Sequence, residues 1–492
     1  MKIIDSDLLS IQESRILAEN AREAQQKLAK FPQEELDLLV EHMAEEVEAH
    51  ARELAEMACE ETGYGNPDDK YIMTKFVCKK VVESMRGVKC VGVLNDDIAA
   101  GTTDYGIPIG VFAAMCAATS PVSTTIFYTL LAVKSGNAIV FSPHPRAKET
   151  ITRTLDIMIK AGEGYGLPEC SVAYMRTVSK AGTIELMNHK DVSAIMIEGV
   201  PHMRKAAVAT GKYILISGTG NGPAFIESSA DVDKAVSDII FSKTFDNGVT
   251  SGAEQAVVVD SDIDEKVRKA FKDQGGYFMN PDEAEKLSSV FYRKDGSPDP
   301  ETIGKTAEQL AKTAGFEVPD GTKILLSEKR FVFREREYEK ERLSPILTYY
   351  VEKDWEHACE KIVKIIVEEE QASTLFLHSN DRTAVEKLAT GEAVQRVIVN
   401  TPAVFGNMGF TTSLVPAMTL GSGRYGCEMT GDNISPLRLV YIRKAAYGIR
   451  TFDDVSRELL AGNDESCVSS ADKESDISAE ALRGMLLKML NK

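Results

Sequence analysis

Short apolar runs alternate with helical stretches from residue 106 onward, and this alternation limits the fold more than any other feature of the chain. Within residues 106–241 the apolar runs are 109–117, 138–141, 194–197 and 213–216, and the helical stretches are 123–134, 147–161, 203–210 and 232–241. Strands that alternate with helices at this spacing form a parallel sheet with helices on its faces. The pattern therefore predicts an α/β fold with a doubly wound domain of the nucleotide-binding type.

A second α/β block is expected after residue 243. Further strands are predicted by the apolar runs at 256–259, 348–351, 373–378 and 397–400, and a helix by the stretch at 357–367. Before the first block, residues 10–63 carry apolar side chains at helical spacing, which predicts amphipathic helices that pack one face on a core.

The chain is acidic, with 57 Lys and Arg against 75 Asp and Glu and a net charge of −18. Such a surface repels phosphate backbones and anionic headgroups, so neither nucleic acid nor a membrane is an expected partner. The eight cysteines are scattered, without a CxxC pair or a cluster with histidine, so no metal site or disulfide framework is expected. The polar start lacks a secretory signal, and the apolar stretch 110–133 is broken by proline and hydroxyl residues. These features predict a cytoplasmic protein.

The most informative segment for chemistry is residues 243–255, with the sequence KTFDNGVTSGAEQ. It is a loop of small residues between an expected helix and the strand that begins at 256. Loops of this kind, held on a rigid scaffold, expose a nucleophile at a domain cleft.

Four blocks in this order are similar to those of one known family. They are FSPHPRAK at 141–148, SGTGNGP at 217–223, KTFDNG at 243–248 with the Glu-Gln pair at 254–255, and ERLSP at 341–345. Over approximately residues 7–450 the chain resembles the aldehyde dehydrogenase superfamily. Within it, the similarity is to the CoA-acylating branch, which includes the aldehyde half of bifunctional alcohol dehydrogenases and the aldehyde enzymes of bacterial microcompartments.

The resemblance implies a domain order and an assembly. We expect N-terminal helices and a nucleotide-binding-type domain at 1–240, a catalytic-type domain at 241–410, and a return segment with an oligomerisation strand at 411–450. A linker at 451–476 and an amphipathic helix at 477–492 follow. The family pairs its protomers through a β-arm, here built from residues near 97–106 and 437–444, so a homodimer or a dimer of dimers is expected.

The resemblance also implies a reaction. A cysteine thiolate attacks the aldehyde, hydride passes to NAD, and the thioester is transferred to coenzyme A, while an asparagine and a backbone amide hold the oxyanion. The cofactor-binding positions carried over from the family are Ser142, His144, Glu198, Gly199, Gly218, Gly220, Asn221 and Glu341. Of these, Gly220 and Asn221 resemble the element that replaces the glutamate base of hydrolytic relatives. His144 is interpreted as a loop residue at the nucleotide edge rather than a catalytic base.

Three positions depart from the family pattern. Ser251 stands where the family has its nucleophilic cysteine, and Ser120 stands where it has the oxyanion asparagine. Residues 198–202, Glu-Gly-Val-Pro-His, replace a Thr-Gly-Gly-Pro-Gly turn that approaches the cofactor's diphosphate. The side chains of Val200 and His202 add bulk there, and Glu198 is expected to add a negative charge. The candidate catalytic residues are therefore Ser251 and Ser120, in a site predicted to be impaired.

Alternative interpretations stay open for several of these residues. Ser251 and Ser120 are also compatible with ordinary loop serines of a protein that does not catalyse. Glu198 can turn outward and leave the cofactor turn usable, and Glu341 can belong to a charged surface run that precedes it. Cys116 is either a displaced nucleophile or, as we favour, a buried strand cysteine.

Three functions follow from these alternatives. The first is a CoA-acylating aldehyde dehydrogenase of a microcompartment, impaired or dead through its substitutions. The second is a fully active short-chain enzyme in which the serine is an engineered substitution. The third is a structural or recruitment paralogue in the lumen of a shell.

The last 16 residues, ISAEALRGMLLKMLNK, return to helical periodicity after the polar stretch 462–476. Their apolar stripe is Ile477, Ala481, Leu482, Met485, Leu486, Met489 and Leu490. A helix this short is marginal alone in water, so it needs a partner. Microcompartment enzymes similar to this chain carry such helices, which predicts docking to a shell or to other cargo. The alternative is a tail helix that folds back on its own domain.

Overall fold

The computed structural model describes residues 5–216, 222–294, 296–328, 341–368, 374–391, 394–420 and 430–461. The chain divides into two compact units, residues 1–94 with 105–443 and residues 95–104 with 444–492. The linker was expected at 451–476, but residues 452–461 of it are helical. The rest of that linker beyond residue 461, the helix expected at 477–492 and the glycine-rich element with Gly218, Gly220 and Asn221 lie outside the described residues.

Four helices open the first unit: α1 (Ser6–Leu28), α2 (Gln33–Ala49), α3 (Ala51–Thr62) and α4 (Pro67–Phe76). They confirm the helical spacing of the sequence, since the apolar residues of α2 are buried at positions 36, 39, 40, 43 and 47. Helix α4 begins at Pro67, where the missing N–H costs no hydrogen bond, and Asn66 caps it by accepting from the backbone N–H of Asp69. The first turn of α4 carries Lys70, whose ammonium contacts Asp246 near the candidate site.

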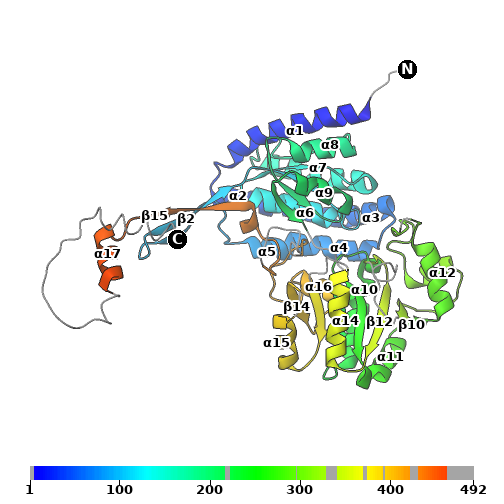
Figure 1. The fold of residues 1–492 in the computed structure, drawn as a ribbon. Coiled ribbons are helices and arrows are strands. Elements are labelled where there is room, and N and C mark those ends of the chain that lie inside the picture. Colours follow the sequence, from blue (N-terminus) through cyan, green and yellow to red (C-terminus); the bar gives the residue numbers. More distant parts are fainter. Residues whose placement is uncertain are drawn as a thin grey trace, which may run out of the picture. The chain divides into compact units, whose positions relative to one another are not determined.

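The first sheet has five parallel strands in the order β5-β4-β3-β6-β7, as the sequence predicts for a doubly wound domain. The strands are β3 (Val111–Met115), β4 (Ala138–Phe141), β5 (Val172–Tyr174), β6 (Val192–Ile197) and β7 (Tyr213–Ile216). Helices α6 (Pro121–Lys134) and α7 (Lys148–Gly164) pack with α2 on one face, whereas α1, α8 (Lys180–Asn188) and α9 (Pro201–Ala209) cover the other (Figure 1).

The second sheet has seven parallel strands in the order β10-β11-β12-β9-β8-β13-β14. They are β8 (Gly222–Ile226), β9 (Glu254–Asp260), β10 (Gly276–Met279), β11 (Ile324–Glu328), β12 (Ile346–Glu352), β13 (Thr374–His378) and β14 (Arg396–Val399). Helices α10 (Val232–Thr244) and α11 (Asp264–Asp273) pack on one face, and α14 (Trp355–Glu368) and α15 (Arg382–Gly391) pack on the other. Helices α12 (Pro281–Phe291) and α13 (Ala307–Ala314) form a further apolar cluster beside β11, and the short α16 (Ala403–Asn407) follows β14.

The first sheet ends before the boundary expected at residue 240. Strand β8 and helix α10 already belong to the second sheet, so the first α/β layer ends with β7 at Ile216. The physical reason is that β8 pairs with β9 and β13, which follow it in sequence, and not with β7.

A third sheet has three strands in the order β1-β2-β15, namely β1 (Gly92–Asp97), β2 (Thr102–Pro108) and β15 (Val440–Ala446). It contains both segments that the sequence assigned to an arm, and Lys444 on β15 pairs with Asp104 on β2 at 2.6 Å. One more helix, α17 (Phe452–Ala461), follows β15. Within the described residues, no helix combines the length and apolar character that crossing a membrane requires.

Candidate active site around Ser251

A cavity of about 280 Å³ in the first unit brings together five of the predicted site residues: His144, Glu198, Gly199, Ser251 and Glu341. They come from different elements, because Glu198 and Gly199 follow β6 directly and Ser251 lies just before β9. Apolar residues Ile197, Val200, Ile216, Ile303 and Leu343 supply much of the remaining lining. The structure thus gathers residues that lie nearly 200 positions apart in the sequence.

Ser251 is only partly buried, and its hydroxyl faces a carboxylate. Its Oγ donates to Oε1 of Glu341 at 3.5 Å, which is the outer limit of a hydrogen bond. Glu341 therefore lies in the cleft with Ser251, and the alternative that it is only a member of a charged surface run is not supported.

The ends of the Ser251 loop are tied together by buried polar groups. The ammonium of Lys243, before the loop, donates to Oε1 of Gln255 at 3.0 Å and to the carbonyl of Arg342 at 2.9 Å. The backbone N–H of Arg342 donates to the same Gln255 oxygen at 2.8 Å, and its guanidinium donates to the Gln255 carbonyl. Burial lowers the pKa of Lys243 to about 7. This network fixes Glu341, one residue before Arg342, against the loop.

A strained turn at 245–248 precedes Ser251. Asp246 and Asn247 both have φ of 52°, a left-handed conformation that Asp and Asn adopt more readily than other residues with side chains. The Asn247 amide donates to the carbonyls of Gly65 and Gly304, at 3.2 and 3.0 Å. The turn is therefore held from two sides.

A buried ion pair connects this turn to α4 and to the loop before α6. The ammonium of Lys70 donates to Oδ2 of Asp246 at 2.7 Å and to the carbonyl of Thr119 at 2.8 Å. Oδ1 of Asp246 accepts from the backbone N–H of Asn66 at 2.8 Å. Burial raises the pKa of Asp246 to about 6, while the Lys70 ammonium opposes that shift. Lys70 thereby sets the distance between the two loops that carry Ser251 and Ser120.

Ser120 lies beside the cleft and not in its lining. It directly precedes α6, where its Oγ is 3.1 Å from Oγ1 of Thr124, and it lines a small adjacent pocket with Lys70, Asp246 and Thr250. Thr119 lines both cavities. A hydroxyl in this position reaches less far than the carboxamide that the family resemblance implies.

Glu198 corrects one sequence-based expectation. Its carboxyl group is neither turned outward nor unpaired: the side chain is 5% exposed, Oε2 accepts from Oγ1 of Thr419 at 3.2 Å, and Tyr128 on α6 is a second partner. Burial raises its pKa to about 8. The two hydrogen bonds lower the pKa, but by less than burial raises it. The group is therefore protonated at pH 7, and the expected negative charge beside a diphosphate is wrong because a buried carboxyl group favours its neutral form.

Two predicted nucleotide-edge residues differ in their placement. His144 lines the cleft, and its Nδ1 accepts from the backbone N–H of Arg146 at 3.1 Å. Burial lowers the pKa of His144, and the charges of His202 and Arg146 add to that effect. Ser142 does not line the cleft, since its Oγ lies 2.8 Å from Oγ1 of Thr183 and links β4 to α8.

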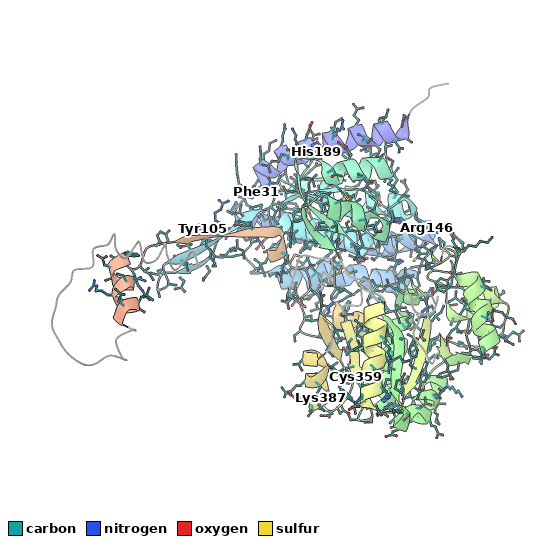
Figure 2. All side chains as sticks on the ribbon, viewed as in Figure 1. Phe31, Tyr105, Arg146, His189, Cys359 and Lys387 are labelled. Atoms are coloured by element: carbon teal, nitrogen blue, oxygen red, sulfur yellow. The ribbon has the colours of Figure 1, made fainter. Side chains whose placement is uncertain are left out.

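Arg146, which Figure 2 labels, contacts a residue of the cleft lining. Its guanidinium lies 5.3 Å from the ring centre of Tyr64, a cleft-lining residue, and 3.6 Å from the carboxylate of Glu301. Arg146 follows β4 of the first sheet, whereas Glu301 belongs to the segment between α12 and α13.

Cys116 is not a displaced nucleophile. The side chain is buried directly after β3, and burial raises the pKa of its thiol above the usual range. The thiolate is the reactive form, so a thiol held neutral in the core does not attack a carbonyl. Among the described residues, no group of three or more His, Cys, Asp or Glu side chains is arranged to hold a metal ion.

The sequence-based prediction missed Lys70, Tyr128 and Thr419. The segment Asn66-Pro67-Asp68-Asp69 marks a helix start, but nothing in it indicates that the next residue contacts Asp246, 176 positions away. The left-handed turn was detectable, since Asp-Asn-Gly is a turn sequence. Tyr128 and Thr419 carry no local signal, because both lie within apolar surroundings.

Comparisons with known proteins agree with this architecture. Residues 8–284 match the Aldehyde dehydrogenase family. The chain is 34% identical over 436 residues to the bifunctional aldehyde-alcohol dehydrogenase AdhE of Escherichia coli, a match that covers 88% of this chain and 49% of that protein. The chain thus spans about half the length of the curated relatives it matches first.

Two solved structures show the same fold. An acetylating aldehyde dehydrogenase from Geobacillus thermoglucosidasius superimposes with a TM-score of 0.88 at 38% identity, covering 92% of this chain and 99% of that one. A propionaldehyde dehydrogenase from the Clostridium phytofermentans fucose utilisation bacterial microcompartment gives a TM-score of 0.80 at 25% identity, covering 88% and 97%.

Proposed function

The chain belongs to the aldehyde dehydrogenase family, and from that membership we propose that it is a CoA-acylating member whose turnover is weak or absent. The acetylating relative from Geobacillus thermoglucosidasius, which is matched over nearly its whole length, supports the acylating branch. The observation that carries the proposal of weak turnover is the side chain at position 251, a serine that faces Glu341 in the cleft.

The acylating reaction needs an ionised nucleophile. A thiol with a pKa of about 8.5 is partly ionised at neutral pH, whereas a serine hydroxyl requires a well-placed base. Glu341 is the carboxylate nearest to this role, and its oxygen is 3.5 Å from Oγ of Ser251. This contact is too long for efficient proton transfer, which favours a distance of about 2.6–3.2 Å.

The oxyanion side of the site is also weak. Ser120 offers a short hydroxyl that is already within 3.1 Å of Oγ1 of Thr124, and it lines the adjacent pocket. Loss of one oxyanion donor typically lowers the rate by about 100- to 1000-fold. Ser251 therefore weakens the nucleophile and Ser120 weakens the oxyanion site, and both are needed for attack on the aldehyde.

The cleft matches one part of a dinucleotide better than the other. Glu341 and the apolar lining suit a ribose and a flat ring, and NAD and coenzyme A are the cofactors that the family implies. At the start of α9, however, the Val200 side chain lines the cavity where a diphosphate would approach the helix N-terminus. Because that part fits poorly, we assign no catalytic step to a bound nucleotide.

The proposal is tested by following NADH absorbance with a short aldehyde, coenzyme A and NAD. We expect the unaltered protein and Ser251→Ala to be equally slow. Ser251→Cys alone should stay at least about 100-fold below an active relative, because Ser120 is unchanged. Ser251→Cys combined with Ser120→Asn should exceed Ser251→Cys alone.

Two results would contradict the proposal. Turnover by the unaltered protein that is lost in Ser251→Ala would show that the serine is a competent nucleophile. Full recovery by Ser251→Cys alone would show that the rest of the site is intact and that the serine is the single obstacle.

We also propose that the three-stranded sheet pairs protomers into a homodimer or a dimer of dimers. Its outer strands expose apolar side chains, namely Val93, Tyr441 and Ile442. Sedimentation of the unaltered protein should give a dimer or larger species, and Tyr441→Glu should shift it toward monomer. A monomeric unaltered protein would contradict this assembly.

A further inference from the structure

Helix α17 presents an apolar face to solvent, and Figure 1 shows it as the last described helix after β15. Its exposed apolar side chains are Phe452 at 57%, Val455 at 37%, Leu459 at 66% and Leu460 at 50%. The last three lie three, seven and eight positions after Phe452, and residues at this spacing share one side of a helix. None of them belongs to an apolar core formed by the described part of the chain.

The N-terminus of α17 is capped by hydrogen bonds. The backbone N–H of Thr451 donates to Oδ2 of Asp454 at 3.1 Å, and the backbone N–H of Asp454 donates back to Oγ1 of Thr451 at 3.3 Å. This reciprocal pair is the geometry of a capping box. A ten-residue helix is nevertheless marginal in water without a packed face, so its apolar side implies a covering segment.

We propose that residues 477–492 of the same chain form the segment that docks on the apolar face of α17. Their Leu and Met stripe has the spacing of a helix that packs one side on a neighbour.

The length of the intervening chain allows this arrangement. Residues 462–476 are polar, and a flexible linker of that length spans about 20 Å on average. Helix α17 is about 15 Å long by its number of residues, so the chain can turn and run back along it. A tether of this kind gives a local concentration in the millimolar range, which exceeds that of most competing partners.

The charges of the two segments are complementary. Helix α17 carries acidic side chains at positions 453, 454 and 458 and one basic side chain at position 457. Residues 477–492 carry basic side chains at positions 483, 488 and 492 and one acidic side chain at position 480. Opposite charge on the flanks of two apolar stripes favours their pairing over the pairing of two copies of either segment.

The same stripe cannot cover α17 and bind a shell protein at once. The expectation that residues 477–492 serve as a docking helix for a shell or other cargo is therefore the competing assignment. Tethering and charge favour α17, and the experiment below separates the two assignments from each other and from docking by a second copy.

The test is hydrogen–deuterium exchange of the full chain, read on peptides that cover 452–461. We expect Leu486→Glu to speed exchange of these amides by about tenfold or more, because it places a charge in the apolar stripe. Leu487→Glu is the matched control, since it makes the same change one position away, off the stripe, and should leave α17 exchange unaltered. A peptide from β9 reports that the first unit is intact in both variants.

The reciprocal change gives a second readout. Leu459→Glu on α17 should speed exchange of residues 477–492, and dilution of the unaltered protein by about 100-fold should leave the protection of α17 unchanged, because a tethered contact does not depend on concentration.

Three results would overturn the proposal. The first is α17 exchange that is fast in the unaltered protein or equal in the Leu486→Glu and Leu487→Glu variants. The second is loss of protection on dilution, which would assign the contact to a second copy. The third is protection of residues 477–492 that appears only when a shell protein is added.

Discussion

Replacement of Glu198 by glutamine is expected to remove a pH-dependent loss of stability that this carboxyl group imposes on the fold. Burial raises its pKa from 4.5 to about 8, and its partners Thr419 and Tyr128 are neutral hydroxyls. Below pH 4.5 the carboxyl group is protonated in both the folded and the unfolded protein. A group whose pKa is raised by folding stabilises the protein most in that range. That contribution falls as the pH rises and is lost above pH 8, where the folded protein must bury the charge.

The magnitude follows from the shift. Each pH unit between the two pKa values changes the free energy of unfolding by about 1.4 kcal/mol. Between pH 6 and pH 8 the loss is therefore about 2 kcal/mol, and over the whole window it is roughly 5 kcal/mol. Glutamine has nearly the same shape and can accept from Thr419, but it does not ionise, so Glu198→Gln does not incur this loss.

The assay is urea unfolding of the unaltered protein and of Glu198→Gln at pH 6, 7 and 8. The stability of the variant relative to the unaltered protein should rise by about 2 kcal/mol across this range. Other groups that titrate here, such as Lys243, are shared by both proteins and cancel in the difference. The matched control is Glu227→Gln: burial alone would raise the pKa of Glu227, but three serine hydroxyls outweigh it and hold that pKa below its usual value. Its difference from the unaltered protein should be flat between pH 6 and pH 8.

A flat difference for Glu198→Gln, or a variant that loses stability relative to the unaltered protein as the pH rises, would refute the protonated carboxyl group. Either result would restore the charged Glu198 that the sequence alone suggested.

Binding of NAD, measured by calorimetry, should be weak in the unaltered protein and should improve in Val200→Gly, because the Val200 side chain lines the cavity at the start of α9. Glu198→Gln should leave that affinity unchanged below pH 8, and a large gain from it would contradict the neutral carboxyl group. Lys70→Met should destabilise the fold by about 3–5 kcal/mol in urea unfolding, because it leaves Asp246 buried without its cation. Adding Asp246→Asn should recover part of that loss, whereas strict additivity of the two changes would show that the pair is not coupled.

Four strands of the first sheet were predictable because they are buried on both faces, whereas the short β5 matches no predicted apolar run. The apolar runs 138–141 and 213–216 coincide with β4 and β7, and the run 194–197 forms most of β6. Strand β8 was not detected, because its five residues follow a glycine-rich stretch and carry no alternation. The sequence therefore gave no sign that the second sheet begins with β8.

The site was predictable only where a motif is local. Family resemblance named Ser251, Glu341, Glu198 and Gly199 as candidate site residues, and all four line one cavity. The state of Glu198 was not predictable, because its partner Thr419 is 221 positions away and the protonation follows from burial. A sequence indicates that a carboxyl group is present, but the surrounding packing decides whether it is charged.

Ser120, Glu198 and Ser251 all lie at the ends of strands or helices. Ser120 directly precedes α6, Glu198 directly follows β6, and Ser251 lies three residues before β9. No ladder hydrogen bond between strands depends on these side chains, so a change at any of them leaves the strand pairing in place. An architecture of this kind separates the inheritance of shape from the inheritance of chemistry. The chemistry of such a site can therefore change while the surface of the scaffold stays the same.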